Sequence, residues 1–250
     1  MPLFSSRFSL LVCLWGLGFS SAPGQPAILD KARAFIGSEN AIAAVKGLRF
    51  IGELEVAEGE LSSGGAAKIE IVFQKPYCQR ITATSENRSE TTALDGFDAW
   101  QRVINHQNSS RWEVNFLGAD QIKRLRANTF ENLSFFRGLE QVGGQLKDLG
   151  ESTVDGIFCH KVAFVHGPGI AFTRSFEVAT GRLVLTETES GTQIREEGEL
   201  RAGDLHFPQR ITTTNLLPDG NKRTIRVTFT AVEVNPGLDA AVFAVPTLRE

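Results

Sequence analysis

The residues that could carry out catalysis or bind a metal are few and form no familiar motif. The four histidines lack the spacing of a metal-binding sequence such as His-Glu-x-x-His; they are His106, His160, His166 and His206. No Gly-x-Ser-x-Gly sequence is present to hold a nucleophilic serine on a sharp turn. We therefore predict a protein that is not an enzyme, with no catalytic residue, no metal ligand and no cofactor.

Two other groups of residues leave alternatives open. The carboxylates of Glu196, Glu197 and Glu199 lie close together in a polar segment. We interpret them as charges on an edge strand, which prevent aggregation, and an exported hydrolase with an atypical site is the enzymatic alternative. Cys78 and Cys159 could form one disulfide in an oxidising compartment or remain two buried thiols.

The first 24 residues have the composition of a secretory signal peptide. Arg7 precedes an apolar run from Phe8 to Phe19, and small residues follow as far as Gly24. A run of about twelve apolar residues is too short to cross a bilayer as a helix. We predict cleavage after Gly24 and a periplasmic protein; an uncleaved anchor is the alternative.

Residues 25–250 are predicted to form a single domain. This length suits one hydrophobic core, and no linker, repeat or low-complexity segment divides it. Without Arg7, the 26 basic residues of the chain become 25 against 29 acidic ones, a formal net charge of −4. This small negative charge argues against nucleic acid as a partner.

The spacing of apolar residues changes along the chain from helical to strand-like. It is helical over residues 27–46, with an interruption at Gly37 and Ser38, and again near residues 119–139. Elsewhere apolar and polar residues alternate, and turns that contain glycine separate ten or eleven predicted strands. We predict an α+β fold in which an N-terminal and a mid-chain helix cover the concave side of a curved antiparallel sheet.

Phenylalanine dominates the apolar positions of these strands, with 18 Phe in the chain against one Tyr. Phe offers a large apolar surface with no polar group that needs a partner. Such a sheet face either packs as a core or lines a hydrophobic cavity. Composition alone does not decide between the two.

Three short segments resemble a known family in their order and spacing. They are Phe-Gln-Lys-Pro-Tyr at 73–77, Asp-Gly-Phe-Asp-Ala-Trp at 95–100, and Leu-Asp-Ala-Ala-Val-Phe at 238–243 followed by Pro246. These segments resemble the outer-membrane lipoprotein-sorting family, the periplasmic lipoprotein carriers with a LolA-like fold. The resemblance implies that the curved sheet is an incomplete β-barrel closed by the helices.

The resemblance also implies a function and partners. In that family the cavity receives the acyl chains of lipoproteins released from the inner membrane. We therefore expect a monomeric, non-enzymatic carrier of lipoprotein acyl chains or another lipid, with inner- and outer-membrane proteins as further partners. The alternative is an envelope sensor or interaction module that binds a lipid or protein without transporting it.

The predicted site lies between the sheet and the helices. Its expected lining consists of inward-facing apolar residues, and the alternative is that they pack as an ordinary core. The predicted lining is Phe50, Ile69, Ile71, Phe73, Trp100, Phe172, Phe176, Val227 and Phe229.

Two cations are predicted at the lid or rim of this site, Lys75 and Arg174. Lys75 stands where the family characteristically has arginine, and lysine lacks the planar fork that can bridge several carbonyls. Arg174 lies between two apolar residues of one strand face, where an unpaired charge would be costly, so we place it at the rim. The basic run Lys123, Arg124 and Arg126 either docks an acidic partner or is a solvated helix face.

Overall fold

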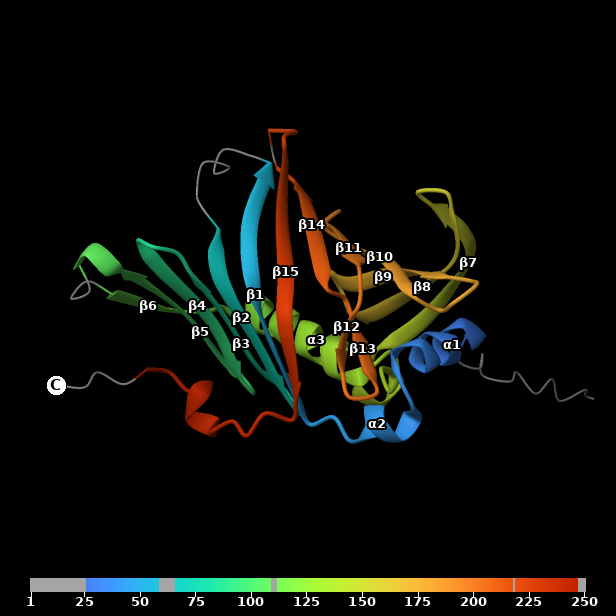
Figure 1. Cartoon of the computed structure of the whole chain (residues 1–250), viewed down its shortest axis with the longest axis horizontal. Helices are drawn as coiled ribbons and strands as arrows, with labels where there is room; N and C mark the ends of the chain where they lie inside the picture. Colours follow the sequence, from blue (N-terminus) through green and yellow to red (C-terminus); the bar gives the residue numbers. More distant parts are fainter. Residues whose placement is uncertain (1–25, 59–65, 109–111, 218, 247–250) are drawn as a thin grey trace, which may run out of the picture.

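The described part of the chain forms one large, curved antiparallel sheet with helices on its concave side (Figure 1). The computed structural model describes residues 26–58, 66–108, 112–217 and 219–246. The predicted signal peptide, residues 1–24, lies outside the described residues. The predicted α+β fold, an incomplete β-barrel covered by an N-terminal and a mid-chain helix, is confirmed.

Most strands pair with their neighbours in sequence, so the sheet is largely a series of hairpins. Thirteen strands form it in the order β6-β5-β4-β3-β2-β1-β15-β14-β11-β10-β9-β8-β7. The strands of this sheet are β1 (Gly47–Glu58), β2 (Ala67–Gln74), β3 (Cys78–Thr84), β4 (Arg88–Asp95), β5 (Asp98–Asn105), β6 (Trp112–Phe116), β7 (Gln145–Val154), β8 (Ile157–Gly167), β9 (Ile170–Glu177), β10 (Leu183–Thr188), β11 (Gln193–Glu197), β14 (Arg210–Leu216) and β15 (Lys222–Val234). Because β6 and β7 end this order, the barrel is left open.

A separate two-stranded hairpin consists of β12 (Leu200–Ala202) and β13 (Leu205–Phe207). With it, the described residues contain fifteen strands, more than the ten or eleven predicted. Strands of three residues are too short to show an alternating pattern in the sequence. Alternation along the sequence therefore does not reveal these two strands, which supply part of the cover.

Three α-helices cover the sheet: α1 (Ala27–Ile36), α2 (Glu39–Ala43) and α3 (Ala119–Ser134). Three short 3₁₀ turns complete the helical elements, η1 (His106–Asn108), η2 (Glu140–Val142) and η3 (Ala240–Val242). None of the described helices has both the length and the apolar character that crossing a bilayer requires. Figure 1 shows α3 passing across the sheet, and it packs against β2, β3 and β4.

The break between α1 and α2 brings the helices against the β12–β13 hairpin. A side chain at Gly37 would place its Cβ 2.7 Å from the Asp204 carbonyl oxygen, so only glycine allows this close approach. Ser38 then begins α2, because its hydroxyl accepts a hydrogen bond from the Ala41 amide. The predicted interruption at Gly37 and Ser38 is the point where the cover turns over the hairpin.

Strand register decides which side chains face the helices. Phe73 pairs with Gln79, Gln79 with Leu94, and Leu94 with Ala99. Gln79 accepts hydrogen bonds from α3 through Asn128 and Thr129, so this row lies on the concave face. Successive residues of a strand point to opposite faces, and the residues that alternate with this row therefore lie on the convex face.

Candidate functional site

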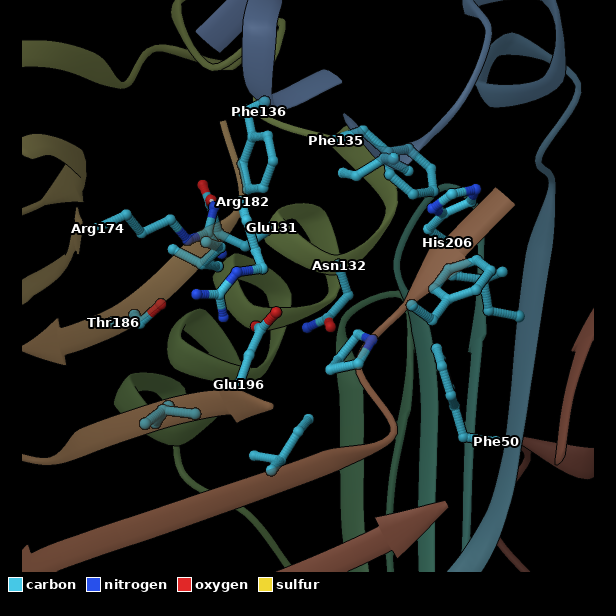
Figure 2. Close-up of a pocket in the computed structure, with 18 of the residues that line it drawn as sticks. Phe50, Glu131, Asn132, Phe135, Phe136, Arg174, Arg182, Thr186, Glu196 and His206 are labelled. Carbon is cyan, nitrogen blue, oxygen red and sulfur yellow. The ribbon is translucent and has the colours of Figure 1, made fainter. Parts of the chain in front are cut away.

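A cavity of about 300 Å³ lies between the concave face of the sheet and its cover. This volume is at the lower end of the range for small-molecule sites. Its lining comes from the sheet, from α1 and α3, and from the β12–β13 hairpin (Figure 2). The structure places on this cavity five of the nine residues predicted to line one: Phe50, Ile71, Phe73, Phe172 and Phe229.

Aromatic and aliphatic side chains form one half of the cavity, at β1, β2, β15 and the hairpin. Phe50 stands edge-on to Phe207 of β13, with ring centroids 5.4 Å apart, and its ring is 5.0 Å from that of Phe229. Leu48 and Ile71 complete this surface. We refer to these residues, with Phe73, as the apolar half.

Four of the predicted lining residues lie elsewhere. Trp100 was predicted on the wrong face: it pairs with Ala93 on the convex side, and its indole N–H donates to the Phe243 carbonyl at 3.0 Å. Phe176 is fully buried in the packed core beneath α1. Ile69 and Val227 share the concave face but do not reach the cavity. The packing of the cover, which the alternation of apolar and polar residues does not reveal, accounts for the positions of Phe176, Ile69 and Val227.

Arg174 was also predicted wrongly, because it lies inside the protein and not at the rim. It is 7 % exposed, and its guanidinium forms an ion pair with Glu131 of α3. Its charge also lies 5.1 Å from the ring centre of Phe136 and 4.9 Å from that of Phe164. The carboxylate and the aromatic faces together compensate the buried cation.

Glu131 connects a second group to this pair. Its other oxygen lies 2.6 Å from Nε2 of His166, which stands edge-on to Phe172. Glu131 is 4 % exposed, so the carboxylate depends on these two partners. Removing one partner of a buried pair leaves an uncompensated charge, which makes this triad sensitive to substitution.

Five polar side chains lie on the other side of the cavity, on α3, β9 and β11 and just before β10, among apolar residues such as Phe136, Phe172 and Leu183. Figure 2 shows Asn132 reaching from α3 and Glu196 reaching from β11 toward the same space. We refer to Glu131, Asn132, Arg174, Arg182 and Glu196 as the polar half. Sequence patterns did not predict Glu131, Asn132, Arg182 and Glu196 as cavity residues.

Glu196 is the unusual residue of the polar half. Burial raises the pKa of Glu196 to about 7, although the positive charges of Arg174 and Arg182 act against this rise. The carboxylate forms no hydrogen bond or ion pair within the described part of the chain. Our prediction of an edge strand here is wrong, because β11 lies between β10 and β14. Alternation with Ile194 on the same strand face is the signal that could have placed Glu196 inside.

The β12–β13 hairpin closes one side of the cavity. Phe207 and His206 both line it, and the ring of His206 lies 6.0 Å from that of Phe35 in α1. An aromatic contact thus joins the hairpin to the helical cover. The cover is therefore made of three helices and a hairpin and not of helices alone.

Comparison with solved structures identifies the fold, although neither protein-family models nor curated proteins match the sequence. A DUF1329 family protein from Desulfovibrio piger superposes with a TM-score of 0.55 at 11 % identity, over 87 % of this chain and 96 % of that one. An outer membrane lipoprotein-sorting protein domain from Vibrio parahaemolyticus gives 0.54 at 10 % identity, over 86 % and 95 %. A LolA superfamily protein from Nitrosomonas europaea gives 0.54 at 13 % identity, over 87 % and 96 %.

The protein has a LolA-like fold. At these identities the likeness extends to the architecture, and the site must be assessed from the residues of this chain. The three sequence segments that resemble the lipoprotein-sorting family predict the same architecture, and Phe73 of the first segment lines the cavity.

Within this LolA-like fold, Arg33 of α1 holds the cover together. Its guanidinium donates to the Phe135 carbonyl at 2.6 Å and to the Ser134 carbonyl at 3.3 Å, at the end of α3. It also forms two hydrogen bonds with Glu39 of α2, at 2.6 and 2.8 Å. Hydrogen bonding to Arg33 lowers the pKa of the Glu39 carboxyl. One buried arginine therefore joins all three helices. No pattern of the sequence distinguished it from the other polar residues of α1.

Lys75 does not occupy such a position. It is exposed and does not line the cavity. Partial desolvation and the nearby charge of Arg33 lower the pKa of the Lys75 ammonium. Its predicted part in a lid stays a prediction.

The basic run on α3 is engaged within the chain. Lys123 lies 3.1 Å from Asp120, and Arg124 pairs with Glu189 beside a second, more open hollow of about 600 Å³. Arg126 stacks between the rings of Tyr77 and Phe97, at 3.9 and 4.0 Å. These contacts favour the interpretation as a helix face over a docking site for an acidic partner.

The remaining chemical candidates lie away from the cavity. Cys78 and Cys159 are both free, the first half-buried and the second buried. Burial is the largest cause of the raised pKa of each thiol. No group of three or more potential metal ligands gathers among the residues that the structure describes.

Proposed function

We propose that this protein is a non-enzymatic carrier that binds the acyl chains of a lipoprotein, or another lipid, in its cavity. The observation that supports it is an apolar half lined by four phenylalanines under a cover held by side-chain contacts. The LolA-like fold is consistent with this use. The proposal includes export by the segment 1–24, a periplasmic location and a single domain over residues 25–250.

Burial of hydrocarbon supplies the driving force. Each methylene transferred from water to the apolar half contributes about 0.8 kcal/mol. A carrier must also release its cargo, so part of this gain has to offset opening of the cover. The contacts of Arg33 and of the hairpin are the interactions that opening would break.

The first experiment asks whether the cavity takes hydrocarbon. Purified protein is extracted with solvent and the extract is analysed for lipids by mass spectrometry, and the delipidated protein is titrated with the fluorescent hydrocarbon diphenylhexatriene. We expect co-purified lipid and saturable binding of the probe. A clean extract together with no probe uptake would contradict the proposal.

Two variants locate the binding site. Phe73→Glu puts a carboxylate in the apolar half and should abolish probe binding while the circular dichroism spectrum stays that of a folded protein. Phe116→Glu is the matched control, because Phe116 is 71 % exposed on β6. Global unfolding of the Phe73 variant would favour a packed core instead.

Transport requires a separate assay. Release of a lipoprotein from inner-membrane vesicles by the purified protein supports a carrier. Probe binding without any release would instead indicate the sensor or interaction module.

A further inference from the structure

The two halves of the cavity differ in chemistry, and groups in the polar half can form further hydrogen bonds. Glu196 has no hydrogen-bond partner among the described residues. Asn132 lines the cavity, its amide nitrogen donates to the Asn128 carbonyl at 2.8 Å, and its oxygen accepts no hydrogen bond from the described residues. Arg182 lines the same space with one ion pair, to Glu177 at 3.4 Å. Two hydrogen-bond acceptors and a donor therefore face the same part of the cavity, where an apolar group of a ligand would leave them unpaired.

The charges of these groups restrict what can bind. Arg174 is compensated by Glu131, and Arg182 by Glu177. Glu196 carries the charge without a direct partner, and it would repel an anion. A cation would be attracted by Glu196 but would also lie close to the guanidinium of Arg182, which lines the same space. A neutral group that both donates and accepts hydrogen bonds satisfies Glu196, Asn132 and Arg182 together.

We propose that the ligand is an amphiphile with an uncharged, protic head group, whose hydroxyl or amide groups bind Glu196, Asn132 and Arg182 while its acyl chain lies in the apolar half. This inference rests on the proposed function, because it names the kind of lipid that the same cavity takes. Two sources supply such chemistry: a glyceride, through hydroxyl groups, and an acylated amine, through its amide.

The selectivity for an uncharged head group should depend on pH because of Glu196. Burial raises the pKa of Glu196 to about 7, so its charge develops across neutral pH. The charged and titratable groups around it are Arg174 on β9, Arg182 before β10, Glu131 on α3, and Glu199 and His206 at the hairpin. An anionic head should therefore bind less well as the pH rises through 7, whereas a neutral head should respond little.

The test compares three probes that share a sixteen-carbon chain. Monopalmitoylglycerol and N-palmitoylglycinamide carry the two neutral heads, and hexadecylsulfonate carries a permanent negative charge. Each probe displaces diphenylhexatriene from wild-type protein at pH 5.5 and at pH 8.5. We expect at least one neutral probe to bind about tenfold tighter than the sulfonate at pH 8.5, and the difference to shrink at pH 5.5.

A pair of variants assigns the effect to one side chain. Glu196→Gln should bind the sulfonate about tenfold tighter than wild type at pH 8.5 and should lose the pH dependence. Glu197→Gln is the matched control, because Glu197 is exposed and points to the opposite face of β11. Its affinities should equal those of the wild type.

The outcomes separate the two proposals. The tighter of the two neutral probes identifies hydroxyl or amide as the preferred head. Equal affinities for neutral and anionic probes on wild type, with intact diphenylhexatriene binding, would overturn this inference and leave the carrier function standing. The same conclusion would follow if the Glu197 variant behaved like the Glu196 variant. Failure of diphenylhexatriene to bind, together with a lipid-free extract, would overturn both proposals.

Discussion

Phenylalanines lie at both ends of the concave face, but some of them pack in a core while others border the cavity. At the β8–β10 end, Phe164 and Phe176 are at most 1 % exposed, and Phe136 packs on Phe176 with ring centres 5.0 Å apart. At the β1–β2–β15 end, Phe50 and Phe229 border the cavity instead. Phenylalanine content therefore does not distinguish a core from a cavity.

The cover makes the difference. Leu29 and Ala32 of α1 join Phe164 and Phe176 in one core cluster, so the helix closes that end. The other end is spanned by α2, by the residues that follow α3 and by the β12–β13 hairpin. These elements pack against Phe50, Phe73 and Phe229, and the cavity lies beside this second cluster. The cavity also borders Ala32 and Phe136 of the first cluster, so it lies where the two clusters meet.

The largest expected effect distinguishes the two ends directly. Phe176→Ala should lower the free energy of unfolding by about 3–5 kcal/mol, because it opens a void in a close-packed core. Phe50→Ala should lower it by less than about 3 kcal/mol, since Phe50 already borders a cavity. Urea denaturation followed by circular dichroism measures both. Equal losses would remove the distinction between the ends.

Next in size is the effect of the buried triad at the junction of the two ends. Glu131→Gln should cost about 3 kcal/mol, because it leaves the Arg174 charge without its carboxylate. Glu55→Gln is the control, since the Glu55–Arg226 pair is exposed and should be worth less than about 1 kcal/mol. The same denaturation assay compares them. A loss at Glu131 no larger than that at Glu55 would show that Arg174 is solvated.

A smaller effect depends on pH and comes from the polar half. Burial raises the pKa of Glu196 from its ordinary 4.5 to about 7, so the native protein holds a proton between these values that the unfolded chain has released. The stabilisation is complete below about pH 4.5 and is lost as the pH rises through 7. Glu196→Gln should therefore be more stable than wild type by at most about 3 kcal/mol at pH 8.5, and similar to it at pH 4.5.

Thermal unfolding across this pH range provides the measurement for Glu196. The Glu197→Gln variant should follow the wild-type curve at every pH. A wild-type curve that does not decline between pH 4.5 and 7 relative to the Glu196 variant would place the carboxylate in contact with solvent.

The smallest effect concerns the contact that joins the cover. Arg33→Lys removes the fork that binds two carbonyls and Glu39, at a cost of about 1–2 kcal/mol, and should speed probe uptake because the cover opens more easily. Stopped-flow fluorescence with diphenylhexatriene measures the rate. Arg137→Lys is the control, because Arg137 also contacts Glu39 but is exposed. Unchanged uptake in the Arg33 variant would exclude opening of the helices as the entry step.

Much of the architecture could be predicted from the sequence because it rests on local patterns. The break at Gly37 and Ser38, the start of the helix at residue 119 and the turns at Asp95-Gly96 and Asp155-Gly156 all follow from spacing and turn chemistry, although that helix ends at Ser134 and not near residue 139. The family resemblance added the open barrel. Alternation along β1, β2 and β15 also brought Phe50, Ile71, Phe73 and Phe229 onto one face.

The errors occurred where long-range pairing decides the environment. A strand pattern does not tell whether β11 is an edge or an interior strand, so Glu196 was interpreted as a solvated charge. The partner of Arg174 lies 43 residues away, on a helix whose rotation the sequence does not specify. Trp100 was placed on the concave face, although its register with Ala93 sets it on the convex one. The cover, which has the fewest repeating patterns, decides which phenylalanines meet a cavity.

The most direct test of the account is a crystal structure of the protein with monopalmitoylglycerol that carries bromine at the end of its acyl chain. The anomalous signal of bromine locates the chain end without reference to the rest of the map. We predict a single site in the apolar half, against Phe50, Phe73 and Phe229. Bromine found only at the exposed Phe97 or Phe116, with the apolar half collapsed, would contradict the central claim that this end of the sheet is hollow and binds hydrocarbon.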